Sequence, residues 1–351
     1  MARHRICVAA PQVPFLRGGA ELHAELLVQA LAAQGHEVDM VTLPYTWTGD
    51  RSSLEQALAW RMIDLAVEVN RVPTDLVIAT KFPSYLVRHP NKVAWIFHQQ
   101  REVYDLHGTA FGPFSQSEED QGLRQALVEM DLHALGEARA LFTNSGNTAA
   151  RLKRYCGTDA RPLYAPPKLY EDLHPGPYGD YLLYVGRLDR IKRIDLAIEA
   201  LHETRAPIEF RVAGRGPHLG ELQQLAHELE LQERVKFLGF VSDEEVVDLY
   251  ANCFGVVLTP HDEDYGFTTL EAFFAGKPVV TTADAGGVLE FVEDEVNGFV
   301  EPPEPSQLAK RLDALNSDRD LCERLGTAGR ELVREKVIWS IALDALTATL
   351  D

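Results

Sequence analysis

The chain has 351 residues, of which 46% are apolar and 25% charged, and its formal net charge at pH 7 is −19. This length exceeds what one hydrophobic core usually serves, so we expect two domains. The negative charge is concentrated in residues 177–351, which hold 17 basic and 33 acidic side chains. This charge repels polyanions, so it disfavours binding to nucleic acid and strong binding to anionic membranes.

Short apolar runs alternate with helical patterns along the first half of the chain. The expected strands are residues 5–10, 37–43, 75–80, 93–98 and 140–145. A helix is expected over residues 20–34, with Leu27 and Leu31 on one face. Residues 101–130 hold no strand candidate, so we expect a long, partly helical excursion there.

The second half repeats this pattern, which is typical of parallel sheets covered by helices. The expected strands are residues 181–186, 209–214, 235–240, 253–259 and 278–283. Five prolines between residues 157 and 180 interrupt both helix and strand and mark a linker, so we place the domain boundary near residue 175. Residues 337–351 read as a final amphipathic helix.

The first residues and the cysteines indicate in which cellular compartment the protein works. Only Ile6–Ala10 are apolar before Pro11, which is too short for a secretory signal, and no stretch approaches the ~20 apolar residues of a spanning helix. The four cysteines are too widely spaced for a short metal-binding motif, and three have the apolar surroundings of buried thiols. We therefore expect a reduced, cytoplasmic protein. These cysteines are Cys7, Cys156, Cys253 and Cys322.

Doubly wound sheets bind ligands beyond the carboxyl ends of their strands, so functional residues should follow strands. The motif "RGGAE" follows the first strand, and Gly18 and Gly19 would let backbone amides approach an anion at a helix start. A plain strand-to-helix turn is the alternative. His98 ends another strand; a lone histidine is more often structural, but this position favours a site.

The stretch "GRLDRIKRID" follows the first strand of the second half. Arg187 and Lys192 can converge on one diphosphate, the first as a planar fork and the second as a point charge. A basic group of Arg187, Arg190, Lys192 and Arg193 is costly in an acidic domain unless it meets anions. The alternative is a cluster of internal salt bridges.

The glycines of "AGRGPHLG" have the spacing G-x-G-x-x-x-G, one residue longer than a dinucleotide fingerprint. A nicotinamide site is therefore not expected. We interpret Gly214, Gly216 and Gly220 as a turn that lines a cleft.

The segment "HDEDYGFTTLEAFFAG" places two acids about a short helix that ends at Gly276. Glu263 precedes the helix and Glu271 lies one turn inside it, with Thr268 or Thr269 as the expected cap. The acids can accept hydrogen bonds from hydroxyl groups of a sugar and a ribose. Alternatively, they only complement the positive helix start.

Taken in order, these motifs resemble the retaining glycosyltransferases of family 4, with the spacing E-x7-E and the later stretch "DAGGVLEFVEDEVNGFV". The resemblance covers nearly the whole chain. It implies an α/β GT-B fold, in which two doubly wound Rossmann-like domains face each other across a cleft. It also implies an acceptor-binding domain of residues 1–174 joined by helix 337–351, and a nucleotide-sugar-binding domain of residues 175–336.

The same resemblance assigns roles to residues. Arg187 and Lys192 would hold the donor diphosphate, Glu271 the ribose and Glu263 the transferred sugar. The catalytic residues so implied are His98, Glu263, Arg187 and Lys192. The donor-binding residues so implied are Gly18, Gly19, Arg187, Lys192, Gly266, Phe267, Thr268 and Glu271.

The expected chemistry stabilises negative charge on a leaving diphosphate through fixed cations and helix N–H groups. Retention in this family implies same-face attack by the acceptor. No cofactor or essential divalent metal is expected, because Arg187 and Lys192 supply positive charge. The acidic run Asp262–Asp264 reads as part of the E-x7-E loop.

Other interpretations remain open at this point. Glu263 and Glu271 could be the paired carboxylates of a glycosidase, or the chain could be a nucleotide-sugar epimerase of the same fold or a silent nucleotide-sugar binder. The sequence does not choose among UDP-, GDP- and ADP-sugars, nor the hydroxyl acceptor, the linkage or the oligomeric state. That acceptor is a glycan, a lipid-linked molecule or a small molecule.

Two further groups bear on partners. The aromatic and histidine side chains of the excursion could stack on an acceptor, although packing is the favoured interpretation: Tyr104, His107, Phe111 and Phe114. The basic side chains of a single helix permit at most weak peripheral membrane contact: Arg151, Lys153 and Arg154.

Overall fold

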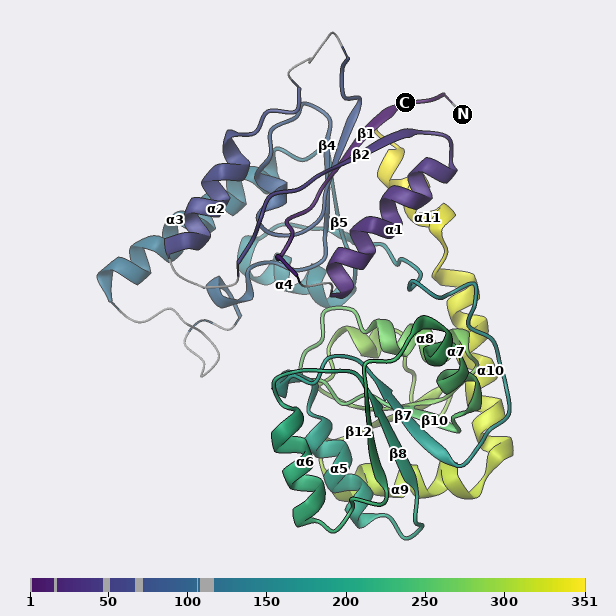
Figure 1. Ribbon diagram of the computed structural model, residues 1–351. Coiled ribbons are helices and arrows are strands. Elements are labelled where there is room, and N and C mark those ends of the chain that lie inside the picture. Colours follow the sequence, from purple (N-terminus) through teal and green to yellow (C-terminus); the bar gives the residue numbers. More distant parts are fainter. Residues whose placement is uncertain are drawn as a thin grey trace. The chain divides into compact units, whose positions relative to one another are not determined.

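The structure is a computed structural model that describes residues 2–15, 18–46, 51–66, 72–105, 107 and 117–350. The chain forms two compact units, each built on one parallel sheet (Figure 1). Unit 1 comprises Met1–Lys168 with Trp339–Asp351, and unit 2 comprises Leu169–Ile338. The observed changes of unit thus fall at 168/169 and 338/339, compared with the expected 174/175 and 336/337.

Unit 1 has a six-stranded sheet in the order β2-β1-β3-β4-β5-β6. Strands β3 and β4 are buried along their whole length, as continuous apolar runs in parallel sheets usually are. The first five strands fall on the expected runs, whereas β6 was not expected, because two residues carry no periodic signal. The strands are β1 (Arg5–Ala9), β2 (Glu37–Val41), β3 (Leu76–Ala79), β4 (Lys92–Ile96), β5 (Ala140–Thr143) and β6 (Arg161–Pro162).

Helices cover both faces of this sheet. One face packs against α1 and α11 through Leu27, Leu31, Leu343 and Leu346, and Figure 1 shows these two helices side by side. The other face packs against α2, α3 and α4. The C-terminal helix therefore joins unit 1, which confirms that part of the fold prediction. The helices are α1 (Gly19–Ala33), α2 (Arg51–Met62), α3 (Glu118–Gly136), α4 (Gly146–Cys156) and α11 (Trp339–Thr347).

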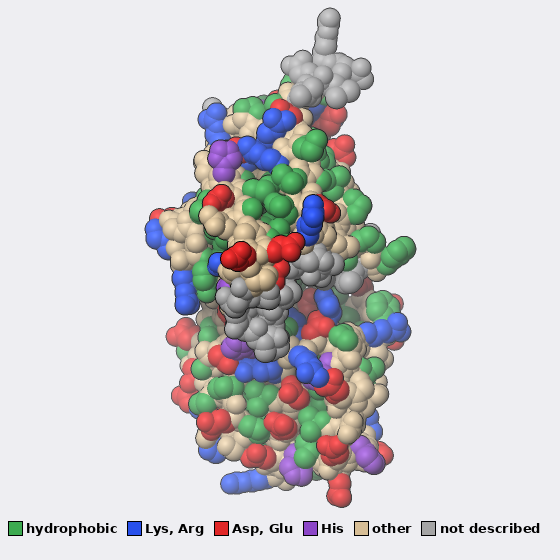
Figure 2. All heavy atoms as spheres, turned by 90° about the vertical axis from the view of Figure 1, so that its left-hand side faces the viewer, with side chains coloured by type: hydrophobic (Ala, Val, Ile, Leu, Met, Phe, Trp, Pro, Cys, Tyr) green, Lys and Arg blue, Asp and Glu red, His purple; other side chains and the backbone are tan. Residues whose placement is uncertain are grey.

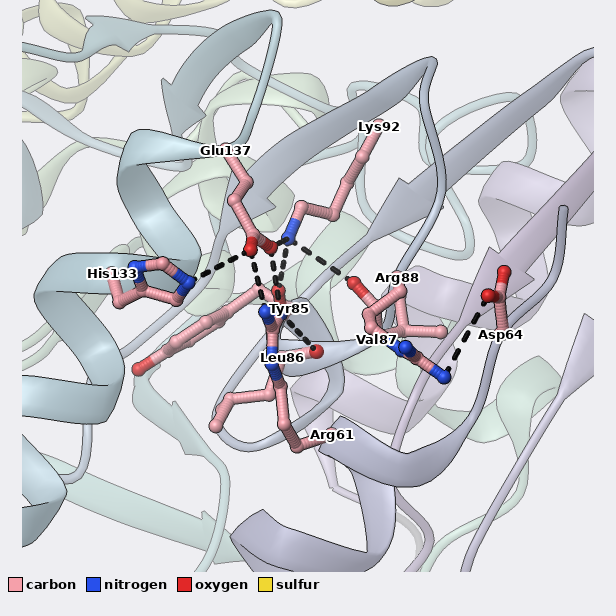
Figure 3. A network of polar contacts seen from close by, with 9 residues as sticks. All are labelled: Arg61, Asp64, Tyr85, Leu86, Val87, Arg88, Lys92, His133 and Glu137. Atoms are coloured by element: carbon pink, nitrogen blue, oxygen red, sulfur yellow. Dashed lines mark hydrogen bonds and ion pairs between the residues drawn. The ribbon is translucent and has the colours of Figure 1, made fainter.

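A network of charged groups fastens α2 and α3 to the sheet (Figure 3). Glu137 follows α3 and accepts two hydrogen bonds from the Arg61 guanidinium, at 2.6 and 2.7 Å. The fully buried Lys92 ammonium donates to Glu137 at 3.2 Å and to the Tyr85 carbonyl at 2.9 Å. The Arg61 hydrogen bonds, helped by Lys92, lower the pKa of Glu137 to about 2. The buried lysine thereby has partners from two elements.

The surface of unit 1 bears on membrane contact. Figure 2 faces the side with α2 and α3, where exposed hydrophobic side chains lie among charged ones. The basic group expected on α4 does not form an exposed patch, because Arg151 is buried and Lys153 pairs with Asp159 at 2.6 Å. No helix in the described part of the chain is long and apolar enough to cross a membrane.

Unit 2 has a six-stranded sheet in the order β12-β11-β10-β7-β8-β9. The four-residue strand β12 was not expected, whereas the other five fall on the expected runs. The strands are β7 (Tyr181–Val185), β8 (Glu209–Ala213), β9 (Val235–Gly239), β10 (Gly255–Val257), β11 (Val279–Thr282) and β12 (Gly298–Glu301).

Some helices of unit 2 begin at start signals that can be recognised in the sequence. Before α7, the Ser242 hydroxyl accepts a hydrogen bond from the Glu245 N–H, and the Glu245 carboxylate accepts one from the Ser242 N–H. Helix α9 begins with Pro305, whose fixed φ suits a first turn. The helices are α5 (Ile194–Glu203), α6 (Leu219–Glu228), α7 (Asp243–Asn252), α8 (Phe267–Phe274), α9 (Pro305–Ser317) and α10 (Arg319–Lys336).

Each sheet has one point at which the strand order reverses. In unit 1 this point lies between β1 and β3, and in unit 2 between β7 and β10. In doubly wound sheets ligands bind beyond the carboxyl ends of the strands at this point. The loops after these four strands are therefore where a site is expected.

Candidate functional site

The loops at the reversal point of unit 2 carry four of the predicted site residues. Arg187 and Lys192 follow β7, and Glu263 and Gly266 follow β10. Lys192 and Glu263, 71 residues apart in the sequence, form a direct hydrogen-bonded ion pair. Both side chains are largely buried, with 24% and 20% exposed, so the pair is only partly screened by water.

The backbone of the Glu263 loop is fixed by the next loop of the sheet. The Glu263 N–H donates to the Ala285 carbonyl at 3.1 Å, and the Gly287 N–H donates to the Glu263 carbonyl at 2.7 Å. A Cβ on Gly287 would lie 2.4 Å from the Asp264 carbonyl, so the approach requires glycine. Two loops thus define the position of this acid.

The four cations of the motif after β7 all have acidic partners. Arg187 pairs with Asp189 at 3.1 Å, Arg190 with Glu221 at 2.8 Å and Arg193 with Asp284 at 2.6 Å. The internal salt bridges that the sequence left open as the alternative are therefore present, and the binding of a diphosphate by this group stays a prediction. Arg187 is half-exposed, and its partner Asp189 lies two residues further along the same loop.

Helix α8 begins earlier than its threonines suggested, at Phe267. Its N-cap is Gly266, with φ 84°, and the expected cap at Thr268 or Thr269 is wrong. The Thr268 hydroxyl instead donates to the Val185 carbonyl at 2.8 Å, which ties the helix start to the end of β7. Within this first turn the Thr269 N–H donates to the Gly266 carbonyl at 3.0 Å. The helix start therefore lies beside the carboxyl end of β7.

Glu271 has a partner of its own. Its carboxylate accepts a hydrogen bond from the Tyr250 hydroxyl of α7 at 2.8 Å. Burial raises the pKa of Glu271, and the Tyr250 hydrogen bond only partly opposes this shift. The E-x7-E acids therefore differ: Glu263 is paired with a cation, and Glu271 with a neutral donor.

The glycine turn after β8 is explained by packing. A Cβ on Gly214 would lie 1.8 Å from the Gly186 carbonyl, and one on Gly216 would lie 2.4 Å from the Leu188 carbonyl. These glycines let two turns of unit 2 pack together. Gly220, inside α6, has open space at its Cβ position.

The corresponding point in unit 1 holds a buried ion pair. Glu21, in the first turn of α1, pairs with Lys81, which follows β3, and their side chains are 4% and 1% exposed. Glu21 also accepts a hydrogen bond from the Gly18 N–H at 2.9 Å. Burial favours a raised pKa for Glu21, but the Lys81 charge and these hydrogen bonds outweigh it and lower the pKa. Gly18 and Gly19 thus begin a helix whose start is held by two buried charges.

His98 lies two residues beyond β4 and is half-buried. Its Nδ1 lies 3.1 Å from the Gln99 carbonyl oxygen, which indicates a protonated Nδ1. The structure therefore places it beyond a strand end of unit 1, as expected, but this strand is β4, which is not one of the two strands at the reversal point.

The excursion after His98 is partly described. Tyr104 is buried and donates its hydroxyl to Asp131 at 2.7 Å, which supports packing at this position. Burial raises the pKa of Asp131 to about 7, although its hydrogen bonds act in the opposite direction. Phe111 and Phe114 lie outside the described residues.

Sequence reasoning missed three residues that shape these loops. Lys81 follows a buried strand, so the strand-end rule could have found it. Tyr250 and Asp284 carry no local signal, because their roles depend on pairing with Glu271 and Arg193 across the fold. Among the described residues, no group of three or more histidine, cysteine or acidic side chains could hold a metal ion.

Comparisons with known proteins agree with this arrangement. Residues 176–332 match the family model described as glycosyl transferases group 1. Alpha-1,3/1,6-mannosyltransferase ALG2 of Homo sapiens is 30% identical over 403 residues, which cover 95% of this chain and 94% of the human protein.

Two solved structures share the fold over 99% of both chains. Sucrose-phosphate synthase of Thermosynechococcus elongatus has a TM-score of 0.77 at 21% identity. The Anabaena protein HepE, solved in complex with UDP-glucose, has a TM-score of 0.73 at 19% identity. Two-unit α/β architecture of this kind is therefore well represented among solved proteins.

Proposed function

The chain belongs to the group 1 glycosyl transferases, and from that premise we propose that it moves a hexosyl group from a nucleotide-diphosphate sugar to a hydroxyl acceptor with retention of configuration. The observation that carries this proposal is the ion pair of Lys192 and Glu263 at the reversal point of unit 2. It joins a cation suited to phosphate with an acid suited to sugar hydroxyls.

A donor offers replacement partners to both members of this pair. Phosphate oxygens can take the Lys192 ammonium, and the hydroxyl groups of the transferred sugar can donate to the Glu263 carboxylate. An unpaired charge would be costly in this partly buried position. Because Lys192 and Glu263 pair with each other, neither charge is left uncompensated before the donor arrives. Binding therefore exchanges one set of charge-assisted hydrogen bonds for another.

In this proposal the protein speeds the reaction by stabilising the charge that develops on the leaving group. Breaking the bond between sugar and phosphate places negative charge on the diphosphate. Arg187, Lys192 and the first-turn N–H groups of α8, after Gly266, are the groups assigned to that charge. Since these groups are fixed before reaction, they do not need to reorganise as charge develops.

The ribose is assigned to Glu271. Its raised pKa and its contact with Tyr250 describe a partly desolvated acid that serves neutral hydroxyl groups. In a desolvated setting an unmatched hydrogen-bonding group is costly, which favours a ligand with a hydroxyl at this position.

Unit 1 is assigned to the acceptor and to closing groups of the donor site. Gly18 and Gly19 are proposed to lie over the donor phosphate and His98 near the reacting sugar. The Gly18 N–H already donates to Glu21, so Gly18 is proposed to help only by having no side chain. The amide of Gly19 is the one proposed to donate to the phosphate.

The proposal includes no essential divalent metal, because Arg187 and Lys192 supply positive charge. Treatment with a chelator is expected to leave sugar transfer unchanged. It also includes a reduced, cytoplasmic location, which the four free thiols support.

The test is sugar transfer by the purified protein with UDP-, GDP- and ADP-hexoses, each offered with glycan, lipid-linked and small-molecule acceptors. A mannose nucleotide leads the panel, because the human relative is a mannosyltransferase. Transfer from one base class with the donor's anomeric configuration, read by NMR, is expected. Inversion would refute the mechanism. The matches do not favour the rivals: a glycosidase would hydrolyse simple glycosides without nucleotide, and an epimerase would change the sugar without an acceptor.

A further inference from the structure

Arg193, the residue after Lys192, has an unusual backbone conformation. Its φ is 47° and its ψ 48°, a left-handed geometry that is unfavourable for a residue with a Cβ. Five non-glycine residues among those described have positive φ. Arg193 is one of these five, and Asp262, which precedes Glu263, is a second. Such conformations persist where the surroundings hold them, often at functional sites.

The surroundings of Arg193 are a set of hydrogen bonds from its guanidinium. Its Nε donates to the Thr259 carbonyl and one Nη to the Pro260 carbonyl, each at 2.9 Å. Both Nη atoms donate to the Asp284 carboxylate, at 2.9 and 2.6 Å. One side chain thus joins the start of the Glu263 loop to the loop after β11.

Further hydrogen bonds join the loop that carries Glu263 to the turn of residues 190–193. The Thr259 hydroxyl donates to the Arg193 carbonyl at 2.9 Å, and the His261 N–H donates to the Ile191 carbonyl at 2.8 Å. The Asp262 N–H donates to the Asp284 carbonyl at 2.9 Å. The loop that carries Glu263 is therefore fixed relative to the turn that carries Lys192.

We propose that Arg193 is a positioning residue: its guanidinium, closed by Asp284, holds the Glu263 carboxylate at the Lys192 ammonium for the donor. This inference rests on the proposed function of that pair. A lysine in its place keeps the charge but lacks the planar fork that bridges the two carbonyls and the carboxylate. Although burial opposes it, the Arg193 hydrogen bonds lower the pKa of Asp284 to about 2, so the contact stays ionic at neutral pH.

The first experiment is a double-mutant cycle on kcat/KM for the donor, with Arg193→Lys and Glu263→Gln. We expect Arg193→Lys alone to lower kcat/KM about tenfold or more, and to add less than about twofold in the Glu263→Gln background, because no carboxylate is left to position. Equal losses in both backgrounds would show a merely structural role and overturn the proposal. The matched control is Arg190→Lys on the same turn, which pairs with the exposed Glu221 and is expected to change kcat/KM less than about twofold.

A second variant separates the backbone conformation from the side chain. Arg193→Gly suits a φ of 47° and so relieves the unfavourable backbone, but it removes the guanidinium. We expect it to lose kcat/KM as Arg193→Lys does. Full activity in this variant would mean that the side chain is not needed.

Hydrogen exchange of the loop amides decides the proposal without a donor. The amides of Asp262 and Glu263 are expected to exchange about tenfold faster in Arg193→Lys than in Arg190→Lys, because their loop loses its fastening. Unchanged exchange would refute the positioning role. Absence of sugar transfer by the natural chain would instead refute the proposed function, while the exchange result would still stand.

Discussion

Removing Lys81 is expected to destabilise unit 1 strongly. Lys81 and Glu21 are 1% and 4% exposed, so Lys81→Met leaves a buried carboxylate without its cation. Loss of one partner from a buried ion pair costs about 3–5 kcal/mol. For a unit of this size each kcal/mol lowers the thermal midpoint by about 2–4 °C, so the midpoint should fall by roughly 6–20 °C.

Differential scanning calorimetry measures this change, with Glu21→Gln/Lys81→Met as the matched control. Glutamine is neutral and still offers a carbonyl to the Gly18 N–H, so the double variant should regain most of the lost stability. A midpoint for Lys81→Met within about 2 °C of the natural chain would show that the pair does not support unit 1 and would refute the reasoning.

The pH dependence gives a second check on the same pair. In the natural chain the pKa of Glu21 is lowered from 4.5, so the pair stabilises the fold above that pH and loses its effect as pH falls through the folded-state pKa. In Lys81→Met, burial should raise the pKa of Glu21, so protonation removes the unfavourable charge as pH falls. The difference between the two proteins should therefore be largest near neutral pH and shrink in acid. A difference independent of pH would contradict this assignment.

Three further variants test other contacts. Gly214→Ala, whose Cβ would lie 1.8 Å from the Gly186 carbonyl, should destabilise unit 2 by about 1–3 kcal/mol in urea unfolding, and an unchanged midpoint would argue against the close approach. Tyr250→Phe removes the hydrogen bond to Glu271 and should raise the donor KM about fivefold with kcat nearly unchanged, whereas a fall in kcat alone would speak against a ribose contact. Glu137→Gln should cost about 2 kcal/mol at pH 7 and nothing below about pH 2, because the folded-state pKa is about 2; a cost that persists in acid would disprove the charge assignment.

The fold, and the sheet edge at which the candidate residues lie, could be predicted because they depend on local signals. Continuous apolar runs indicate buried parallel strands, and the residues that follow such strands lie at one edge of the sheet. That reasoning located Arg187, Lys192 and Glu263. It failed for β6, which has only two residues, and for β12, although β12 is as long as strands that were predicted.

The contacts within the site could not be predicted in the same way. Lys192 meets Glu263 only because β10 lies beside β7, and strand order is not visible in a single sequence. Arg193 looks like its basic neighbours, yet its positive φ turns it toward backbone carbonyls. Gly214 looks like a ligand-binding glycine but is required by a neighbouring turn.

The most direct test of the central claim is calorimetric titration of UDP-glucose and a mannose nucleotide into the natural chain, Lys192→Ala and Arg190→Ala. We predict binding of at least one nucleotide sugar, a loss of about a hundredfold in affinity in Lys192→Ala and less than about a twofold change in Arg190→Ala. Equal affinity of the natural chain and Lys192→Ala would contradict the assignment of this cation to the donor diphosphate.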